Sequence, residues 1–272
     1  MSNQNYLDGV DIIYWINLER AKDREKHMKK VLDDPIFNNI MTRQFKAIDV
    51  NGDKNIYDML DIKEKKMSDN EYACLLSHLE TIRKFSKSNY ENALIFEDDV
   101  SLDYKKYWDK TIQEVIDNAP KDWEILKLCC FKHKPYKKEY NLWNYLPGSG
   151  NTDTNWSCVS YLINNKAANK IIKSIYIDKK YKLENTLPHQ ADFYIYSKLK
   201  TYGYKYPYFT YRDNNDTYVQ KSSKGWKHEK KNKITKFLKK TIKNISPKKR
   251  INNKTKRNKT KRNKTKRNKT KR

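Results

Sequence analysis

Hydrophobic positions along residues 10–212 follow two patterns that alternate along the chain. Short continuous apolar runs are typical of buried strands, whereas apolar residues three or four positions apart are typical of helices. The expected strands are Val10–Leu18, Phe45–Ile48, Ala93–Phe96, Trp123–Leu128, Cys158–Ile163 and Tyr206–Tyr211. The expected helices are Lys22–Leu32, one after Ser68, Tyr104–Asn118, Asn165–Ile175 and one from Pro188 to Gly203. This alternation predicts an α/β sandwich with a mostly parallel sheet.

The helix after Ser68 has the clearest start signal. Ser68 and Glu71 match the S-x-x-E pattern of a capping box, in which each side chain bonds the backbone N–H of the other residue. Residues 135–156, by contrast, show no period and contain Pro147-Gly148. We expect a long functional loop there.

Basic residues concentrate at the C-terminus. Residues 221–272 contain 25 Lys and Arg residues and one acidic residue, Glu229, whereas residues 1–220 contain 34 basic and 32 acidic residues. From Asn253 to Arg272 the unit Asn-Lys-Thr-Lys-Arg repeats four times without an apolar residue, which predicts disorder. The chain therefore divides into a body (1–220), a basic segment (221–250) and a disordered tail (251–272). The body is not a uniformly basic nucleic-acid-binding domain.

The basic segment predicts an amphipathic helix surrounded by lysines. Its apolar residues share one helical face: Ile234, Phe237, Leu238, Ile242 and Ile245. Such a helix lies in a membrane interface or docks on a partner, and the repeats would add attraction to anionic lipid. We therefore hypothesise that the tail holds the protein on an anionic membrane surface. Packing on the body's own surface and nucleic-acid binding remain alternatives.

The polar N-terminal residues and the spacing of the cysteines predict a protein of a reducing compartment. Met1–Gly9 is polar and no segment has the roughly 18–20 apolar residues of a membrane span, so a cytoplasmic or peripheral membrane protein is expected. The cysteines form no C-x-x-C pair and are expected to be small buried thiols. Cys74 and His78 have i, i+4 spacing, but two ligands do not make a zinc site.

The sharpest chemical signal is Glu97-Asp98-Asp99, which directly follows an apolar strand. Three adjacent carboxylates repel one another unless a cation lies among them. A divalent, oxygen-preferring ion such as Mn²⁺ or Mg²⁺ would relieve that repulsion and bind substrate phosphates. The alternative is a solvated acidic turn that caps the next helix.

Further polar residues lie where ligands bind α/β proteins, beyond the carboxyl ends of strands. Asn17 ends the first strand, and Arg20 and Arg24 follow it. Arginine fits phosphate with its planar fork, but both arginines also suit an exposed helix with Glu–Arg pairs.

Three more residues are candidates for the site. Ser77 and His78 lie beside the apolar face of the capped helix, where a buried structural histidine is the alternative. Asp192 follows Pro188, and an aspartate in the first turn of a helix ordinarily complements the helix dipole.

Taken together and in order, these motifs resemble glycosyltransferase family 25. That family includes bacterial lipopolysaccharide-biosynthesis galactosyltransferases and collagen hydroxylysine galactosyltransferases. The segments that carry the resemblance are Ile16–Arg20 with Arg24, Phe45–Asp49, Met67–His78, Ala93–Val100, Asp122–Leu126, Ser160–Ala168 and the region of Pro188 and Asp192. Two departures are Trp156, where the family often has Gly before the strand, and the longer spacing between Pro188 and Asp192.

The resemblance implies a GT-A-like fold, a catalytic domain over 1–220 and a UDP-sugar donor, often UDP-galactose. It implies Mn²⁺ or Mg²⁺ at Asp98 and Asp99, and Asp192 as the base of an inverting transfer. The implied donor-binding residues are Asn17, Arg20, Arg24, Ser77, His78, Glu97 and Asp98. The acceptor is left open between a glycan, a lipid-linked saccharide and hydroxylysine, and a viral source would suit the repetitive basic tail. The alternative function is a non-catalytic protein that binds nucleic acid or membrane through the tail.

Overall fold

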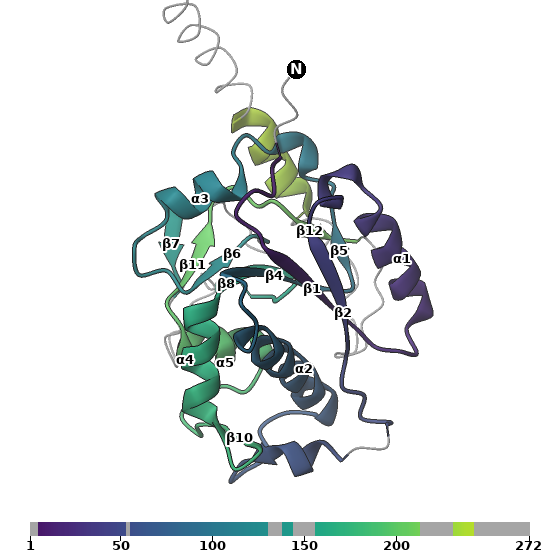
Figure 1. Ribbon diagram of the computed structural model, residues 1–272, viewed down its shortest axis with the longest axis vertical. Coiled ribbons are helices and arrows are strands. Elements are labelled where there is room, and N and C mark those ends of the chain that lie inside the picture. Colours follow the sequence, from purple (N-terminus) through teal and green to yellow (C-terminus); the bar gives the residue numbers. More distant parts are fainter. Residues whose placement is uncertain (1–4, 53–54, 130–137, 144–155, 213–230, 242–272) are drawn as a thin grey trace, which may run out of the picture.

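The protein is built around one twisted sheet with helices on both faces (Figure 1). The computed structural model describes residues 5–52, 55–129, 138–143, 156–212 and 231–241. The sheet has seven strands in the order β2-β1-β4-β8-β6-β11-β7. In chain order these are β1 (Ile12–Asn17), β2 (Met41–Lys46), β4 (Asn92–Glu97), β6 (Ile125–Lys127), β7 (Tyr140–Leu142), β8 (Ser160–Asn164) and β11 (Thr201–Tyr204).

Most strands of this sheet run in one direction. β1 is parallel to both β2 and β4, and β6 is parallel to β11. β8 runs antiparallel to its neighbours β4 and β6, and β7 runs antiparallel to β11. Five strands therefore share a direction, and the predicted α/β architecture with a mostly parallel sheet is confirmed.

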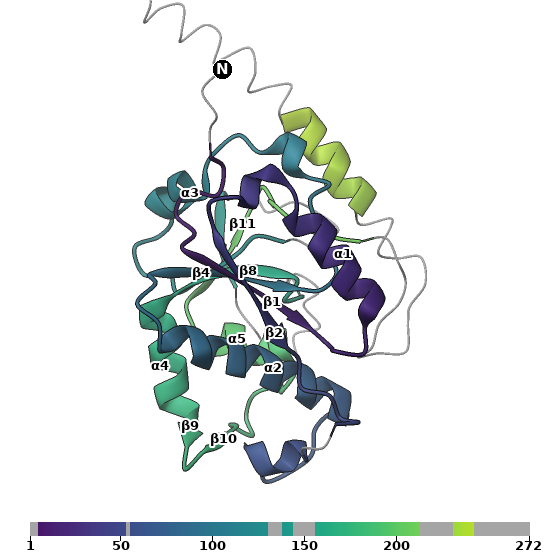
Figure 2. The same ribbon diagram turned by 45° about the vertical axis from the view of Figure 1, so that its right-hand side comes forward.

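Helices cover the two faces of the sheet unequally (Figures 1 and 2). The helices are α1 (Lys22–Leu32), α2 (Asp69–Ser86), α3 (Ile112–Asn118), α4 (Asn165–Ile175) and α5 (Ala191–Lys198). Side chains alternate along a strand, so Tyr14 packs in the cluster with α2, α4 and α5, and Trp15 packs in the cluster with α1 and α3. The two hydrophobic clusters fix the sheet between the helical layers.

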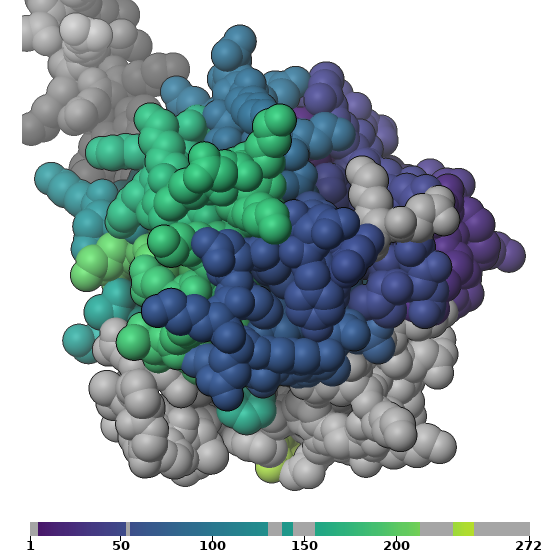
Figure 3. All heavy atoms as spheres, turned by 90° about the horizontal axis from the view of Figure 1, so that it is seen from below, coloured from purple at the N-terminus to yellow at the C-terminus, as the bar shows by residue number. Residues whose placement is uncertain are grey.

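Two small sheets complete the body. β10 (Lys180–Lys182) pairs with β3 (Leu60–Asp61) and β9 (Tyr176–Ile177), next to the 3-10 helix η2 (Ile56–Met59). This places the segments before α2 and after α4 side by side, coloured blue and green in the view from below (Figure 3). β12 (Thr210–Tyr211) pairs with β5 (Val100–Ser101), directly after the acidic turn. The remaining 3-10 helices are η1 (Pro35–Phe37) and η3 (Lys105–Tyr107).

Two predicted helices were wrong in extent. The predicted helix Tyr104–Asn118 is instead η3 followed by α3, because Thr111 and Glu114 form a capping box that starts a new helix. The helix expected to reach Gly203 ends at Lys198, because Gly203 pairs with residues of β6 and β7 inside the sheet. The predicted loop 135–156 contains β7, and most of its other residues lie outside the described ones. No helix among the described residues is long and apolar enough to cross a membrane.

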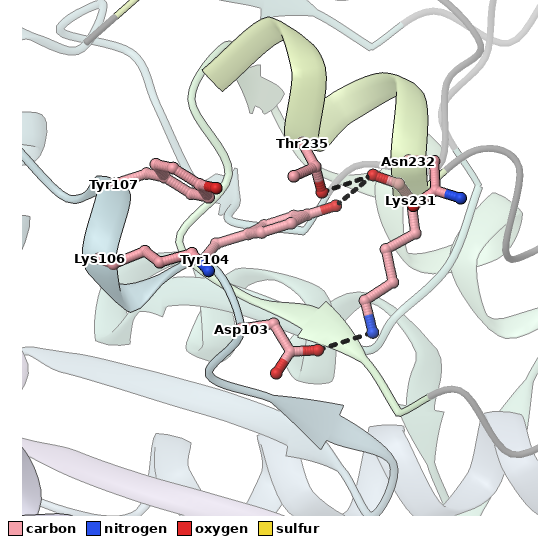
Figure 4. A pocket seen from close by; sticks show the side chains of 7 residues that line it. All are labelled: Asp103, Tyr104, Lys106, Tyr107, Lys231, Asn232 and Thr235. Carbon is pink, nitrogen blue, oxygen red and sulfur yellow. Dashed lines mark hydrogen bonds and ion pairs between the residues drawn. The ribbon is translucent and has the colours of Figure 1, made fainter. Parts of the chain in front are cut away.

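The helix over residues 231–241 packs on the body. Ile234 and Leu238 are buried against Tyr104, and the Phe237 ring stacks on Tyr206 with centroids 5.9 Å apart. Lys231 forms an ion pair of 2.7 Å with Asp103. A hollow of about 280 Å³ lies between η3 and the helix. Figure 4 shows the side chains that line it, with the ion pair of Lys231 and Asp103 among them. The apolar face at Ile234 and Leu238 is therefore covered by the body, as the alternative of packing on the body predicted, while the attachment of the tail to an anionic membrane stays a prediction.

Leu238→Asp is expected to detach this helix. A buried leucine contributes about 1.5–3 kcal/mol, and a carboxylate against Tyr104 would add a desolvation cost. Hydrogen–deuterium exchange should then show loss of protection over residues 231–241 with β1 and β4 unchanged. Lys239→Asp, on the exposed side of the same turn, is the matched control and should leave protection intact. Equal protection in both variants would show that the apolar contact does not hold the helix.

Candidate active site

The acidic turn lies at the edge of the sheet where the parallel strands end. Glu97 is the last residue of β4, and Asp98 and Asp99 form the turn before β5. Asn17 ends the neighbouring strand β1, and Lys127 ends β6 in the same direction. Polar side chains from three strands therefore reach one edge of the sheet, which is where α/β proteins bind ligands.

Asp98 is held inside the protein by two partners. The Nη1 atom of Arg24 donates to one carboxylate oxygen at 2.5 Å, and the Nδ2 atom of Asn17 donates to the other at 2.9 Å. All three side chains are buried, with exposed fractions of 8% or less for each residue. Both oxygens of Asp98 are thus used for internal bonds, which does not favour the predicted role of Asp98 as a metal ligand.

Arg24 is surrounded by the three carboxylates of the acidic turn. Burial opposes the charged form of Arg24, but the charges of Asp98, Asp99 and Glu97 outweigh it and raise the arginine's pKa. Burial also raises the pKa of Asp98 above its usual range, although Arg24 and Asn17 act against this. Arg24 therefore serves as the internal counter-charge of the acidic turn.

Glu97 and Asp99 present carboxylates that could hold a divalent ion. Both residues are partly exposed, unlike Asp98. The backbone carbonyl of Asp99 accepts a bond of 2.7 Å from Arg212 N–H, which ties the turn to the chain after β12. Two partly exposed carboxylates beside an arginine-braced third one fit the oxygen ligands that Mn²⁺ and Mg²⁺ prefer.

His78 joins α2 to the acidic turn. Its Nε2 atom lies 3.3 Å from an oxygen of Glu97, and its Nδ1 atom lies 3.1 Å from the hydroxyl of Tyr161 on β8. His78 is 1% exposed, so these two partners fix the ring. The residue predicted beside the apolar face of the helix thus reaches the site.

Two other predicted donor residues have different surroundings. Arg20 is half-exposed and bonds Asp49 at 2.6 Å, at the end of the sheet beyond β2. The hydroxyl of Ser77 donates to the carbonyl of Ala73 at 2.6 Å and accepts from the N–H of Ile48 at 2.9 Å. Ser77 therefore fastens the chain after β2 to α2.

Asp192 contacts the backbone just before β8. One of its oxygens accepts from the N–H of Ser157 at 2.6 Å, and the hydroxyl of Tyr196 donates to the carbonyl of Ser157 at 3.0 Å. Ser157 has φ of 95°, a left-handed conformation that is strained for a residue with a side chain. Asp192 and Tyr196 thus hold this strained residue from both sides.

Asp192 and the acidic turn lie in one region of the molecule. Burial raises the pKa of the Cys158 thiol, and the charges of Asp192 and then Glu97 raise it further. The Tyr161 ring, whose hydroxyl meets His78, contacts the Tyr196 ring edge-on at 6.0 Å. A continuous set of side chains therefore connects Glu97 to Asp192.

Lys127 belongs to this region and was not predicted. It is 1% exposed, and its ammonium group lies 4.4 Å from the centroid of the Tyr196 ring. A buried lysine is rare in a sheet, and this one ends its strand at the site edge. The available signal was a single lysine inside the apolar run of the predicted strand Trp123–Leu128.

The chain is similar in sequence to known proteins. A family model described as glycosyltransferase family 25 (LPS biosynthesis protein) matches residues 10–187. Procollagen galactosyltransferase 2 of Homo sapiens is 25% identical over 227 residues, which cover 75% of this chain and 33% of that protein. A glycosyltransferase 25 family member of Aedes aegypti is 27% identical over 194 residues, which cover 66% of this chain and 31% of that protein. The chain thus spans about a third of the length of the curated relatives it matches.

This chain was also compared with solved structures. It matches one described as a glycosyltransferase involved in the glycosylation of the major capsid of PBCV-1, with a TM-score of 0.34 and 12% sequence identity. That alignment covers 62% of this chain and 67% of the other. The family whose model matches residues 10–187 is a family of glycosyltransferases. Because the model matches more than half of its residues, the chain belongs to glycosyltransferase family 25.

Proposed function

We propose that the protein transfers a hexose, with galactose as the first candidate, from a UDP-sugar to a hydroxyl group of its acceptor. The observation that carries this proposal is the acidic turn at the carboxyl edge of the sheet, where Arg24 and Asn17 donate hydrogen bonds to Asp98. The family supplies the class of reaction, and the galactosyltransferase relatives favour galactose. Residues 1–220 would form the catalytic domain.

In this proposal Glu97 and Asp99 hold a Mn²⁺ or Mg²⁺ ion. The ion would neutralise the negative charge that builds on the diphosphate leaving group. Asp98 would position the turn rather than bind the ion, because Arg24 and Asn17 occupy both of its oxygens. His78, fixed by Tyr161, would keep the Glu97 carboxylate in place.

Asp192 is the proposed base of an inverting transfer. It would take the proton of the acceptor hydroxyl while that oxygen attacks the anomeric carbon and the bond to the diphosphate breaks, so that UDP departs with its electron pair. The support is that Asp192 and Glu97 both lie near enough to the Cys158 thiol to raise its pKa by their charges. Its bond to Ser157 N–H fixes the direction of the carboxylate.

Asp192→Asn is expected to lower sugar transfer by at least a hundredfold while UDP binding is unchanged, because the amide cannot accept the proton. Transfer is measured by product formation and UDP binding by calorimetry with Mn²⁺ present. Tyr196→Phe, which removes the bonds of the hydroxyl group to the Ser157 carbonyl and the Cys158 thiol, is the control for disturbance of that segment. Loss of UDP binding in Asp192→Asn would assign Asp192 to the structure or the donor site instead.

The acceptor is proposed by class only: a glycan, a lipid-linked saccharide or a hydroxylysine side chain. The proposal as a whole is tested by a screen of donor hydrolysis across UDP-sugars with Mn²⁺. Hydrolysis of one UDP-hexose above all others is expected. No hydrolysis and no binding of any nucleotide sugar would contradict it.

A further inference from the structure

Three potential metal ligands from different parts of the chain meet beside α2. The Cys74 sulfur, a ring nitrogen of His78 and a carboxylate oxygen of Glu97 all lie within 4.8 Å of one another. Cys74 and His78 are one turn apart on α2, and Glu97 comes from the end of β4. Two ligands on one helical face with a third from a neighbouring element is an arrangement common in zinc sites.

The distance between the His78 nitrogen and the Glu97 oxygen is compatible with a shared metal ion. A charge-assisted N–H···O bond is about 2.7–2.9 Å long. The Nε2 atom of His78 and the oxygen of Glu97 are 3.3 Å apart. Two ligand atoms bound tetrahedrally to one zinc ion at about 2.0–2.1 Å are separated by about 3.3 Å. The nitrogen and oxygen thus already have the spacing that a shared ion requires.

The surroundings of His78 also fit a ligand. The Nδ1 atom of His78 lies 3.1 Å from the Tyr161 hydroxyl, which leaves Nε2 facing Glu97. A second partner of this kind fixes the tautomer and the ring direction of metal-binding histidines. Cys74 and Glu97 are partly exposed, so an ion can reach a site whose base is the buried ring of His78. Because the three ligand atoms lie within 4.8 Å of one another, side-chain movements of about 1 Å would bring them into binding distance.

We propose that Cys74, His78 and Glu97 bind Zn²⁺ in a thiolate-containing metal site that shares Glu97 with the proposed donor-metal site. A sulfur and an imidazole select zinc over Mg²⁺ and Mn²⁺, which prefer oxygen ligands. The three ligands leave a fourth position for water or a solute group. The ion would link α2 to the end of β4, so zinc should also raise the melting temperature.

Cobalt titration of the full chain tests the site, because Co²⁺ bound to a thiolate gives a charge-transfer band in the near ultraviolet. Chelator-treated, reduced protein should bind one equivalent of Co²⁺ with this band, and Zn²⁺ should displace it. Cys74→Ser should abolish the band. Cys158→Ser, at a buried thiol near the same carboxylates, is the matched control and should keep it. Asp99→Ala should also keep the band, because Asp99 is a ligand of the proposed donor-metal ion and not of this one.

Tyr161→Phe provides a second variant that changes no ligand. It should weaken Zn²⁺ binding about 10-fold or more, measured against a chromophoric chelator, while the charge-transfer band persists. The absence of a charge-transfer band in the wild-type protein would overturn the proposal. So would a band that survives Cys74→Ser or is lost in Cys158→Ser. The wild-type titration decides the matter even if a variant does not fold.

Discussion

Asp99→Ala is expected to abolish the stabilisation that UDP and Mn²⁺ together give to the protein. In the wild type, UDP at a hundred times its Kd should add about 2.7 kcal/mol to the free energy of unfolding. For a body of this size that corresponds to a rise in melting temperature of roughly 5–10 °C. Without the Asp99 carboxylate the proposed ion loses one of two ligands, so neither the ion nor the diphosphate should bind.

The substitution is selective because the backbone contact of Asp99 does not involve its side chain. Its carbonyl oxygen accepts the Arg212 N–H bond, which an alanine preserves. Asp58→Ala removes an exposed carboxylate of η2, far along the chain from the turn, and should leave the UDP–Mn²⁺ shift at its wild-type size. A full shift in Asp99→Ala would exclude this carboxylate from metal binding. A shift by UDP that does not need metal would contradict the metal-dependent donor site.

Arg24→Met is expected to lower the free energy of unfolding by about 3–5 kcal/mol, measured by urea denaturation. Methionine fills the volume of the arginine stem but leaves the Asp98 carboxylate buried without its counter-charge. Removal of one partner from a buried ion pair is costly because the other charge cannot return to water. The double variant Arg24→Met with Asp98→Asn should recover much of this loss, since no uncompensated charge remains.

The decrease in the free energy of unfolding that Arg24→Met causes should grow with pH. Burial already raises the pKa of Asp98 in the folded protein, and loss of the arginine raises it further. A raised pKa means that the folded state binds the proton more tightly than the unfolded state does. The resulting stability is present below the ordinary aspartate pKa of about 3.9 and is lost as pH rises through the raised value. The difference from wild type should therefore be smaller at pH 5 than at pH 8.

Arg20→Met is the matched control for this prediction. Arg20 also pairs with an aspartate, Asp49, but its side chain is 42% exposed. Exposed ion pairs contribute about 0–1 kcal/mol because water and salt screen them. If Arg24→Met and Arg20→Met lowered the free energy of unfolding equally, Arg24 would not be buried against Asp98 in solution.

Much of the site could be predicted as a set of residue types but not as a set of contacts. Charged and amide side chains that close apolar strands identified Asn17 and the acidic turn, and Arg24 followed on the next helix. Nothing in the chain's local pattern could show that Arg24 pairs with Asp98, 74 positions away. Lys127 was missed because a single lysine at the end of a strand ordinarily reaches solvent.

The sequence by itself determined the local elements. The bounds of α1 and α4 and the capping box that starts α2 agree with the prediction, because caps and helical spacing act between residues a few positions apart. The strands β1 and β4 were also located, since their continuous apolar runs are buried on both faces of the sheet.

Only the tertiary structure decided which surfaces and side chains meet. The apolar face of the 231–241 helix suited a membrane, a partner or the body, and in the structure it packs against Tyr104, 130 positions before Ile234 in the chain. The same holds for Glu97, which joins Cys74 and His78 only because β4 lies next to α2 in space. Strand order and helix placement depend on burial summed over the whole chain. Contacts between residues far apart in the chain therefore depend on how all the elements pack together, which no local pattern shows.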